Sequence, residues 1–99
     1  LLRTLADTVR DKPDQHLVVA GHTDSVPISE NLQTTFPTNW ELSAARATAV
    51  VRFLQEKGEI EPERLTASGF SYYKPVASNE SEEGRKQNRR IEIMLMPVR

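Results

Sequence analysis

The apolar run that ends at Ala20 constrains the fold of this chain more than any other feature. Leu17, Val18, Val19 and Ala20 follow one another without a polar break. Such a short, valine-rich run is typical of a strand that is covered on both faces. Gly21 comes next, and a glycine here lets backbone or a ligand approach closely. We therefore expect residues 16–20 to form a central strand of a sheet.

Helical and strand-like segments alternate around this run. Pro13 ends an amphipathic pattern over residues 1–11, because proline lacks the amide proton that a helix interior needs. Residues 25–38 contain Pro27 and Pro37 and show no sustained period, so we expect a long loop that lies over a functional site. The other expected elements are a helix at 39–57, a strand at 64–68, a turn of helix at 81–86, and a strand with one buried face at 91–96. The expected order is therefore α-β-α-β-α-β.

The helix at 39–57 has clear start and stop signals. Thr38 and Glu41 match a capping box, in which each side chain accepts a hydrogen bond from the other residue's backbone amide. Gly58 is expected to end the helix as the residue with a positive φ. The predicted buried stripe consists of Trp40, Ala44, Ala47, Val51 and Leu54.

Composition narrows the class of protein. The chain has 99 residues, of which 37% are hydrophobic and 27% charged, which fits one globular domain over residues 1–99. The formal net charge of −1 gives little long-range attraction to nucleic acid or to an anionic membrane. The absence of cysteine excludes disulfides, thiolate catalysis and most structural zinc sites.

Asp24 and Arg46 form the most informative pair of charges. Asp24 follows the predicted central strand, and Arg46 lies in the helix that comes next. An acid and a base placed in this way can hold the ammonium and the carboxylate of one zwitterion. Two alternatives stay open: Asp24 forms an Asx turn, and Arg46 pairs internally with Glu41 or Asp24.

A basic cluster precedes the last predicted strand and suggests a second, different class of ligand. Its members are Arg85, Lys86, Arg89 and Arg90. Such a cluster binds phosphate or nucleic acid in some proteins, but Tyr72 and Tyr73 are distant in sequence and no aromatic residues interleave with the strands. A solvated surface is the alternative interpretation.

Enzymatic motifs are absent from the sequence. His16 and His22 are too few for a zinc site without carboxylates, and no G-x-S-x-G elbow accompanies His22. The four glycines form no cluster that would cradle a phosphate. We therefore expect no catalysis, no cofactor and no metal.

Four motifs occur in order along the chain. They are Gly21-His22-Thr23-Asp24, the helical segment 39–47, the segment 64–70 and the segment 83–93. Together they resemble the OmpA-like peptidoglycan-binding domain over residues 16–95. The segment FPTNWELS at residues 36–43, with the long loop before it, is similar in particular to the periplasmic domain of the flagellar stator protein MotB.

The resemblance implies noncovalent binding of a diaminopimelate-containing stem peptide of peptidoglycan. The family's aspartate falls on Asp24, which would accept from the ammonium, and its helix arginine falls on Arg46, which would bind the carboxylate as a bidentate fork. Asn39 matches an asparagine that is expected to orient the loop or the ligand. The other residues expected to line the site are Thr23, Leu42 and Arg90.

The fold implied by the resemblance is α/β, of the α+β sandwich type, with a β-α-β-α-β-β mixed sheet and helices packed on it. The chain starts at the family's first helix, so we expect the family's first strand to be lacking. Residues 91–96 would then be an exposed sheet edge, with lower stability or pairing between chains as the consequence.

The resemblance also implies a cellular setting. We expect a periplasmic domain of an inner-membrane protein that anchors the flagellar motor stator to the cell wall. The implied partners are peptidoglycan, a second copy of the chain in a homodimer, and a membrane-embedded stator protein reached through an upstream region. The alternative is a peptidoglycan tether of the outer membrane or of a secretion system. No nucleic-acid partner is expected.

Overall fold

The structure, a computed structural model, describes residues 1–97. The elements in chain order are α1 (Leu2–Val9), β1 (Gln15–His22), the 3-10 helix η1 (Glu30–Leu32), α2 (Asn39–Glu56), the 3-10 helix η2 (Pro62–Arg64), β2 (Leu65–Gly69), α3 (Glu82–Asn88) and β3 (Arg90–Pro97). The predicted order of helices and strands is confirmed, and the ends of the predicted elements agree to within about two residues.

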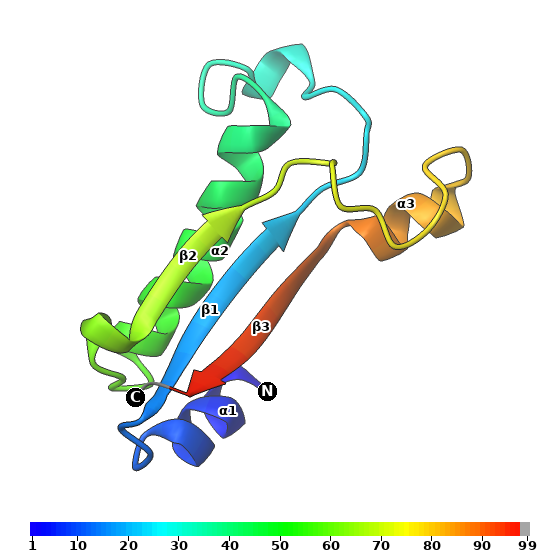
Figure 1. The fold of residues 1–99 in the computed structure, drawn as a ribbon. Helices are drawn as coiled ribbons and strands as arrows, with labels where there is room; N and C mark the ends of the chain where they lie inside the picture. The colour runs from blue at the N-terminus through cyan, green and yellow to red at the C-terminus, as the bar shows by residue number, and fades with distance from the viewer. Residues whose placement is uncertain (98–99) are drawn as a thin grey trace.

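β1 is the central strand of a mixed sheet, as predicted (Figure 1). β2 pairs with it in parallel and β3 pairs with it antiparallel, so that Leu17 lies opposite both Leu65 and Leu95. β3 forms one edge of this sheet, as expected. Its Ile91 and Ile93 pack against the core, whereas Met94, Leu95 and Met96, near the end of the strand, are exposed apolar residues.

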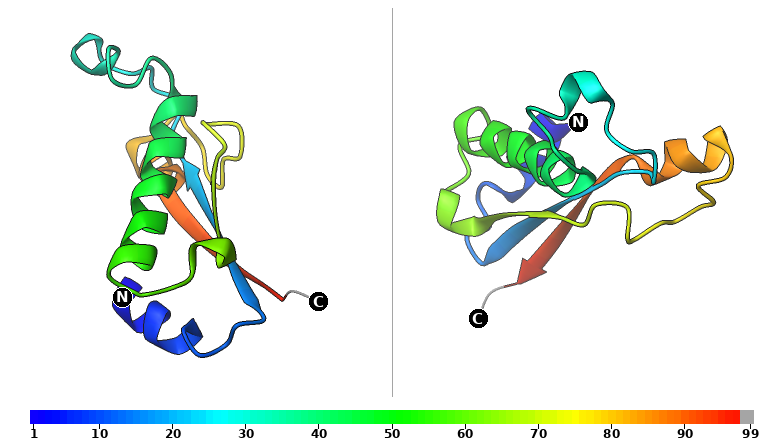
Figure 2. Two further views of the ribbon diagram at one scale, coloured as in Figure 1. Left: turned by 90° about the vertical axis from the view of Figure 1, so that its left-hand side faces the viewer. Right: turned by 90° about the horizontal axis from the view of Figure 1, so that it is seen from above.

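The two longer helices, α1 and α2, lie on the same face of the sheet (Figure 2). Because side chains alternate along a strand, Leu17 and Val19 point to these helices and form the core with them. The core residues are Ala6, Val9, Leu17, Val19, Ala47, Leu54 and Ile60. The prediction that β1 is covered on both faces was wrong for part of the face away from the helices. On the opposite face Val18 is only half-buried, while Ala20 and His22 are buried and the His22 ring stacks on Phe70.

The buried stripe of α2 differs from the predicted one. Trp40 and Ala44 are exposed, and the buried residues of the helix are Asn39, Ser43, Ala47 and Leu54. The reason lies in the sheet, where a Cβ added to Gly69 would lie 2.6 Å from the backbone nitrogen of Ala44. The helix backbone therefore approaches the sheet too closely for a tryptophan, and the small Ser43 occupies the contact.

The capping box at the start of α2 is confirmed, but the predicted role of Gly58 was wrong. Glu59, not Gly58, has the positive φ, at 58°. Gly58 is needed for space instead, because an added Cβ would lie 2.7 Å from the Cβ of Ala6 in α1.

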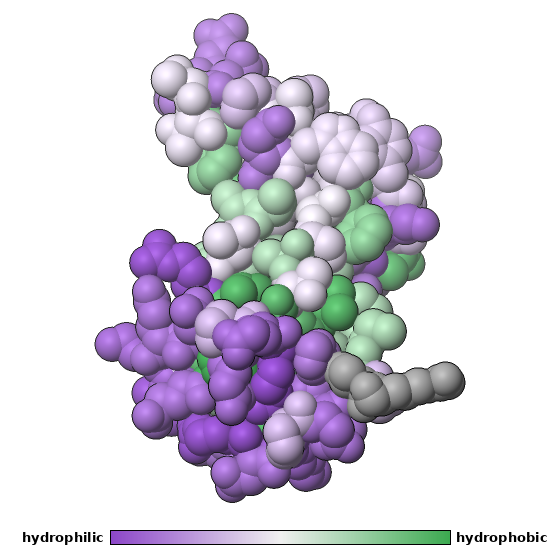
Figure 3. Space-filling model, turned by 60° about the vertical axis from the view of Figure 1, so that its left-hand side comes forward, coloured by the Kyte–Doolittle hydropathy of each residue, from purple (hydrophilic) through white to green (hydrophobic). Residues whose placement is uncertain are grey.

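Apolar residues gather in a band across the middle of the molecule, above a lower end that hydrophilic residues cover (Figure 3).

Candidate functional site

The candidate site lies where β1 ends and the long loop begins. Thr23 and Asp24 follow β1 directly and are buried, with exposed fractions of 4% and 7%. The Thr23 backbone amide donates to the Ser71 carbonyl at 2.9 Å, which extends the link between the ends of β1 and β2. The Asp24 carboxylate is therefore held in a fixed place at the carboxyl end of the central strand.

Both oxygens of the Asp24 carboxylate have partners within the chain. Oδ1 accepts from the Val26 backbone amide at 3.0 Å, which is the hydrogen bond of an Asx turn. The Asx-turn alternative is therefore confirmed. Oδ2 accepts from Nη1 of Arg89 at 2.6 Å. Asp24 is thus a buried, paired carboxylate and not a solvated loop residue.

Asn39 fixes the loop that follows Asp24. It is the first residue of α2 and is buried, and its Nδ2 donates to the Val26 carbonyl at 3.1 Å and to the Asp24 carbonyl at 3.5 Å. These contacts explain why the chain needs an amide side chain there, since only Asn or Gln offers two donors without a charge. The loop and α2 are therefore held together at the site.

Arg46 lies two helical turns further along α2 and lines the same cavity as Asp24. The cavity has a volume of about 480 Å³. Within residues 1–97 no hydrogen bond or ion pair engages the Arg46 guanidinium, because Asp24 pairs with Arg89 and Glu41 belongs to the capping box. The alternative of an internal ion pair for Arg46 is therefore wrong.

The cavity is lined by loop, helix and α3 residues together. Thr23, Asn39 and Leu42 lie there with Asp24 and Arg46, so five of the six predicted site residues share one cavity. The long loop covers it, as expected, through Val26, Pro27, Ile28, Ser29 and Leu32. α3 contributes Glu82, Arg85 and Arg89.

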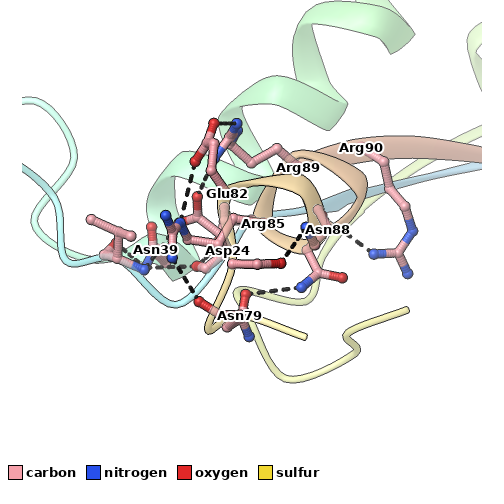
Figure 4. A network of polar contacts seen from close by, with 12 residues as sticks. Asp24, Asn39, Asn79, Glu82, Arg85, Asn88, Arg89 and Arg90 are labelled. Atoms are coloured by element: carbon pink, nitrogen blue, oxygen red, sulfur yellow. Dashed lines mark hydrogen bonds and ion pairs between the residues drawn. The ribbon is translucent and has the colours of Figure 1, made fainter. Parts of the chain in front are cut away.

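The α3 residues of the cavity form a chain of ion pairs with Asp24 (Figure 4). Arg89 bridges Asp24 and Glu82, with its Nη2 at 2.8 Å from Oε2 of Glu82. Arg85 contacts Glu82 through Nε at 3.2 Å. The hydrogen bonds that Arg89 donates to Glu82 and then to Asp24 raise the pKa of Arg89, and those that Glu82 accepts from Arg89 and then Arg85 lower the pKa of the Glu82 carboxyl. Arg89 and Glu82 are therefore charged at neutral pH.

Asn88 anchors α3 against the neighbouring loop. It is fully buried, its Oδ1 accepts from the backbone amides of Val76 and Ala77, and its Nδ2 donates to the Ala77 carbonyl and to Oδ1 of Asn79. The amide side chain is thus saturated by the loop (Figure 4). This anchor sets the position from which Arg89 reaches Asp24.

Arg90 lies outside the cavity, in contrast to the prediction that it lines the site. It is the first residue of β3, whereas Arg89 caps the C-terminal end of α3. Its Nε donates to Glu92 at 2.7 Å and its Nη2 to the Lys74 carbonyl at 2.9 Å. Arg89 takes the place that the sequence interpretation gave to Arg90.

The residues that the sequence interpretation missed are Glu82, Arg85 and Arg89 as members of the cavity. Their spacing of three and then four residues places them on one face of a helix, which is the signal that could have grouped them. Arg85, Arg89 and Arg90 each contact a carboxylate. The basic cluster is therefore largely neutralised within the protein, which weakens the phosphate or nucleic-acid alternative.

The arrangement suits binding of a small charged group. Three guanidinium groups and two carboxylates surround a cavity whose other walls are mainly apolar. Within residues 1–97, no group of three or more His, Asp or Glu side chains is placed to hold a metal ion. In the same range no helix combines the length and the apolar character that a membrane crossing requires.

Comparisons with known proteins point to one family. The OmpA family model matches residues 1–89. Motility protein B of Bacillus subtilis (strain 168) is 35% identical over 97 residues, which cover 98% of this chain and 36% of that protein. The chain thus spans about a third of the length of this curated relative.

Solved structures agree with this result. A MotB-like protein from Desulfovibrio vulgaris has a TM-score of 0.86 and 39% identity, covering 99% of this chain and 59% of that one. The cell wall anchor of the T6SS from Pseudomonas aeruginosa has a TM-score of 0.82 and 40% identity, covering 99% of this chain and 64% of that one. Because the family model matches most of the sequence and these relatives share its fold, the chain belongs to the OmpA family.

Proposed function

We propose that this chain binds peptidoglycan noncovalently, by holding the diaminopimelate of a stem peptide between Asp24 and Arg46. The observation that carries the proposal is that Arg46 lines the same cavity as Asp24 and has no protein partner within residues 1–97. A half-buried guanidinium without a partner is poised to bind a carboxylate through two parallel hydrogen bonds. The printed name of the T6SS relative, a cell wall anchor, supports the same ligand.

Asp24 can accept the ligand's ammonium without losing its present partners. A carboxylate offers about four acceptor positions, and only two hydrogen bonds, from Val26 and Arg89, reach this one within residues 1–97. The cavity holds Arg46, Arg85 and Arg89 against two carboxylates, which leaves one excess positive charge. A stem peptide with more carboxylates than ammonium groups would complement that charge. No step of this proposal requires catalysis.

A sacculus-retention assay tests the proposal. Diaminopimelate-containing sacculi should retain the wild-type chain and lose both Asp24→Ala and Arg46→Ala by roughly tenfold or more in affinity, because each variant removes a charge-assisted contact. Arg52→Ala is the matched control, since Arg52 lies on the same helix, is exposed, and pairs with Glu56. Equal retention of all four proteins would refute the proposal.

We further propose that the chain is the wall-anchoring part of a periplasmic protein of the flagellar stator. The name of the Bacillus relative, motility protein B, supports this setting, whereas the T6SS relative supports a secretion-system tether. A homodimer and a membrane-embedded partner belong to the stator version of the proposal. Replacing the matching segment of a stator protein with this chain distinguishes the two. Restored swimming would support the stator, and sacculus binding without swimming would favour another tether.

A further inference from the structure

Three aromatic side chains, two exposed and one half-buried, form a stacked row beside the candidate site. Trp40 lies in the first turn of α2, and Tyr72 and Tyr73 lie in the loop after β2. The Trp40 and Tyr73 rings stack with centroids 5.4 Å apart, and the Tyr72 and Tyr73 rings with centroids 4.3 Å apart. Trp40 is 50% exposed and Tyr73 is 56% exposed. Large aromatic rings held in order but left in solvent are typical of a binding surface.

The aromatic row borders a second, smaller cavity of about 380 Å³. Its remaining walls combine hydroxyl and amide groups with two prolines and an isoleucine, and none of its lining side chains is charged. The lining residues other than the aromatic ones are Ser25, Pro27, Ile28, Gln33, Pro37, Thr38, Asn39 and Ser71. Three of them, Pro27, Ile28 and Asn39, also line the charged cavity. The two cavities therefore lie on either side of one short loop segment.

The chemistry of this second cavity differs from that of the first. Flat apolar rings edged by neutral donors and acceptors match a pyranose ring, which has an apolar face of C–H groups and a rim of hydroxyl and amide groups. A fatty acyl chain would offer no hydrogen-bonding group to the polar part of this lining. In peptidoglycan the stem peptide is covalently attached to an N-acetylated sugar, so a sugar must lie close to any bound peptide.

We propose that Trp40 and Tyr73 form a carbohydrate subsite that stacks on an N-acetylated sugar ring of the glycan strand. The inference rests on the proposed binding of the stem peptide in the adjoining cavity, and it adds a second point of attachment for the same polymer. The two contacts act together, because binding at one raises the local concentration of ligand at the other. Tyr72 supports the subsite by stacking on Tyr73 and by accepting a hydrogen bond from the Tyr73 hydroxyl at 3.2 Å.

The chain contains a single tryptophan, so its fluorescence reports on this subsite directly. The probes are peptide-free glycan strands, obtained by removing the stem peptides from sacculi, and chitotetraose, a soluble oligomer of N-acetylglucosamine. Both should change the Trp40 emission in a saturable way. Tyr73→Ala should weaken this binding by roughly tenfold, which corresponds to about 1.4 kcal/mol, whereas Tyr73→Phe should keep it.

Two further variants separate this subsite from the peptide cavity. Asp24→Ala should leave the glycan response of Trp40 unchanged, and Tyr73→Ala should leave binding of a free diaminopimelate tripeptide unchanged. Leu95→Ala is the matched surface control, because Leu95 is 49% exposed on the distant edge strand. Thermal unfolding of each variant confirms that it is folded.

Each outcome decides for or against the subsite. A glycan response that Tyr73→Ala abolishes in a folded protein would support it, whether or not the tripeptide binds in the other cavity. No response to either glycan probe would overturn it, even if Asp24→Ala loses the tripeptide. A response to a proline-rich peptide without a response to glycan would also overturn it, and would assign the aromatic row to protein recognition.

Discussion

Two arginines, Arg64 and Arg46, show how the same side chain serves structure or ligand binding. Arg64, the last residue of η2, is 5% exposed and donates to the backbone carbonyls of Val9, Arg10, Lys12 and Gln15 as well as to Glu61. Arg46, on α2, is half-buried and has no hydrogen-bond or ion-pair partner within residues 1–97. The first guanidinium is saturated by the fold, and the second is left for something outside it.

The difference teaches that burial alone does not identify a structural arginine. What counts is whether the donors of the guanidinium have acceptors, because a buried donor without an acceptor lowers stability. A fold tolerates such a donor where a ligand supplies the acceptor. At Arg64 the carbonyls that follow α1 supply the partners. At Arg46 the cavity supplies space, and we expect the ligand to supply the partner.

The largest expected effect is on stability and falls on Arg64. Arg64→Ala should lower the free energy of unfolding by about 3–5 kcal/mol, because it leaves several buried carbonyls without donors. Arg52→Ala, which removes only an exposed ion pair, should change it by about 0.5 kcal/mol or less. Urea unfolding of both variants measures the difference. Similar losses in the two variants would break the distinction between the arginines.

Asn88 should behave like Arg64 although it lies near the site. Asn88→Ala removes an amide with four hydrogen bonds and should cost about 2 kcal/mol of unfolding free energy. Asn31→Ala is the control, since Asn31 is an exposed residue of η1. Urea unfolding again provides the measurement. An unchanged unfolding free energy for Asn88→Ala would show that the loop at residues 76–79 does not depend on this anchor.

Arg46 should behave in the opposite way, with binding affected and stability spared. Arg46→Lys should weaken binding of a diaminopimelate tripeptide by roughly tenfold, because an ammonium cannot form the bidentate fork. Its unfolding free energy should stay within about 0.5 kcal/mol of the wild type. Isothermal titration calorimetry and urea unfolding measure the two quantities. Full binding by the lysine variant would argue that Arg46 acts only as a point charge.

The smallest expected effect is the contribution of His22 to the pH dependence of the unfolding free energy. Burial, and then the charge of Arg90, lower the pKa of His22 below its ordinary value of 6.5. The folded state therefore binds fewer protons than the unfolded state, and the stability from neutral His22 is full above pH 6.5 and falls as the pH drops toward the folded-state pKa. Unfolding free energies at pH 7.5 and 5.0 should differ more for the wild type than for His22→Phe. Equal pH dependence in both would contradict this.

The fold was largely predictable from the sequence because its signals are local. The apolar run at Leu17 to Ala20, the Thr38 and Glu41 capping box and the proline after α1 each specify one element without distant contacts. The side of α2 that is buried was not predictable in this way. It depends on Gly69 of β2, which brings the backbone of α2 too close for Trp40, and single-segment periodicity contains no information on such a contact.

The site was predictable in part for the same reason. Asp24 follows the central strand and Arg46 lies in the helix after it, so their shared cavity follows from the local order of elements. The pairing of Asp24 with Arg89 spans 65 residues and depends on how Asn88 anchors α3. The family resemblance favoured Arg90, its neighbour, whereas Arg89 at the C-terminal end of α3 is the residue that reaches Asp24.

A structure of the complex with a diaminopimelate-containing stem peptide tests the central claim most directly. We expect the ligand's ammonium within hydrogen-bond distance of the Asp24 carboxylate and one ligand carboxylate in a two-bond contact with the Arg46 guanidinium. A peptide bound elsewhere, or bound in the cavity with its carboxylate turned away from Arg46, would contradict it.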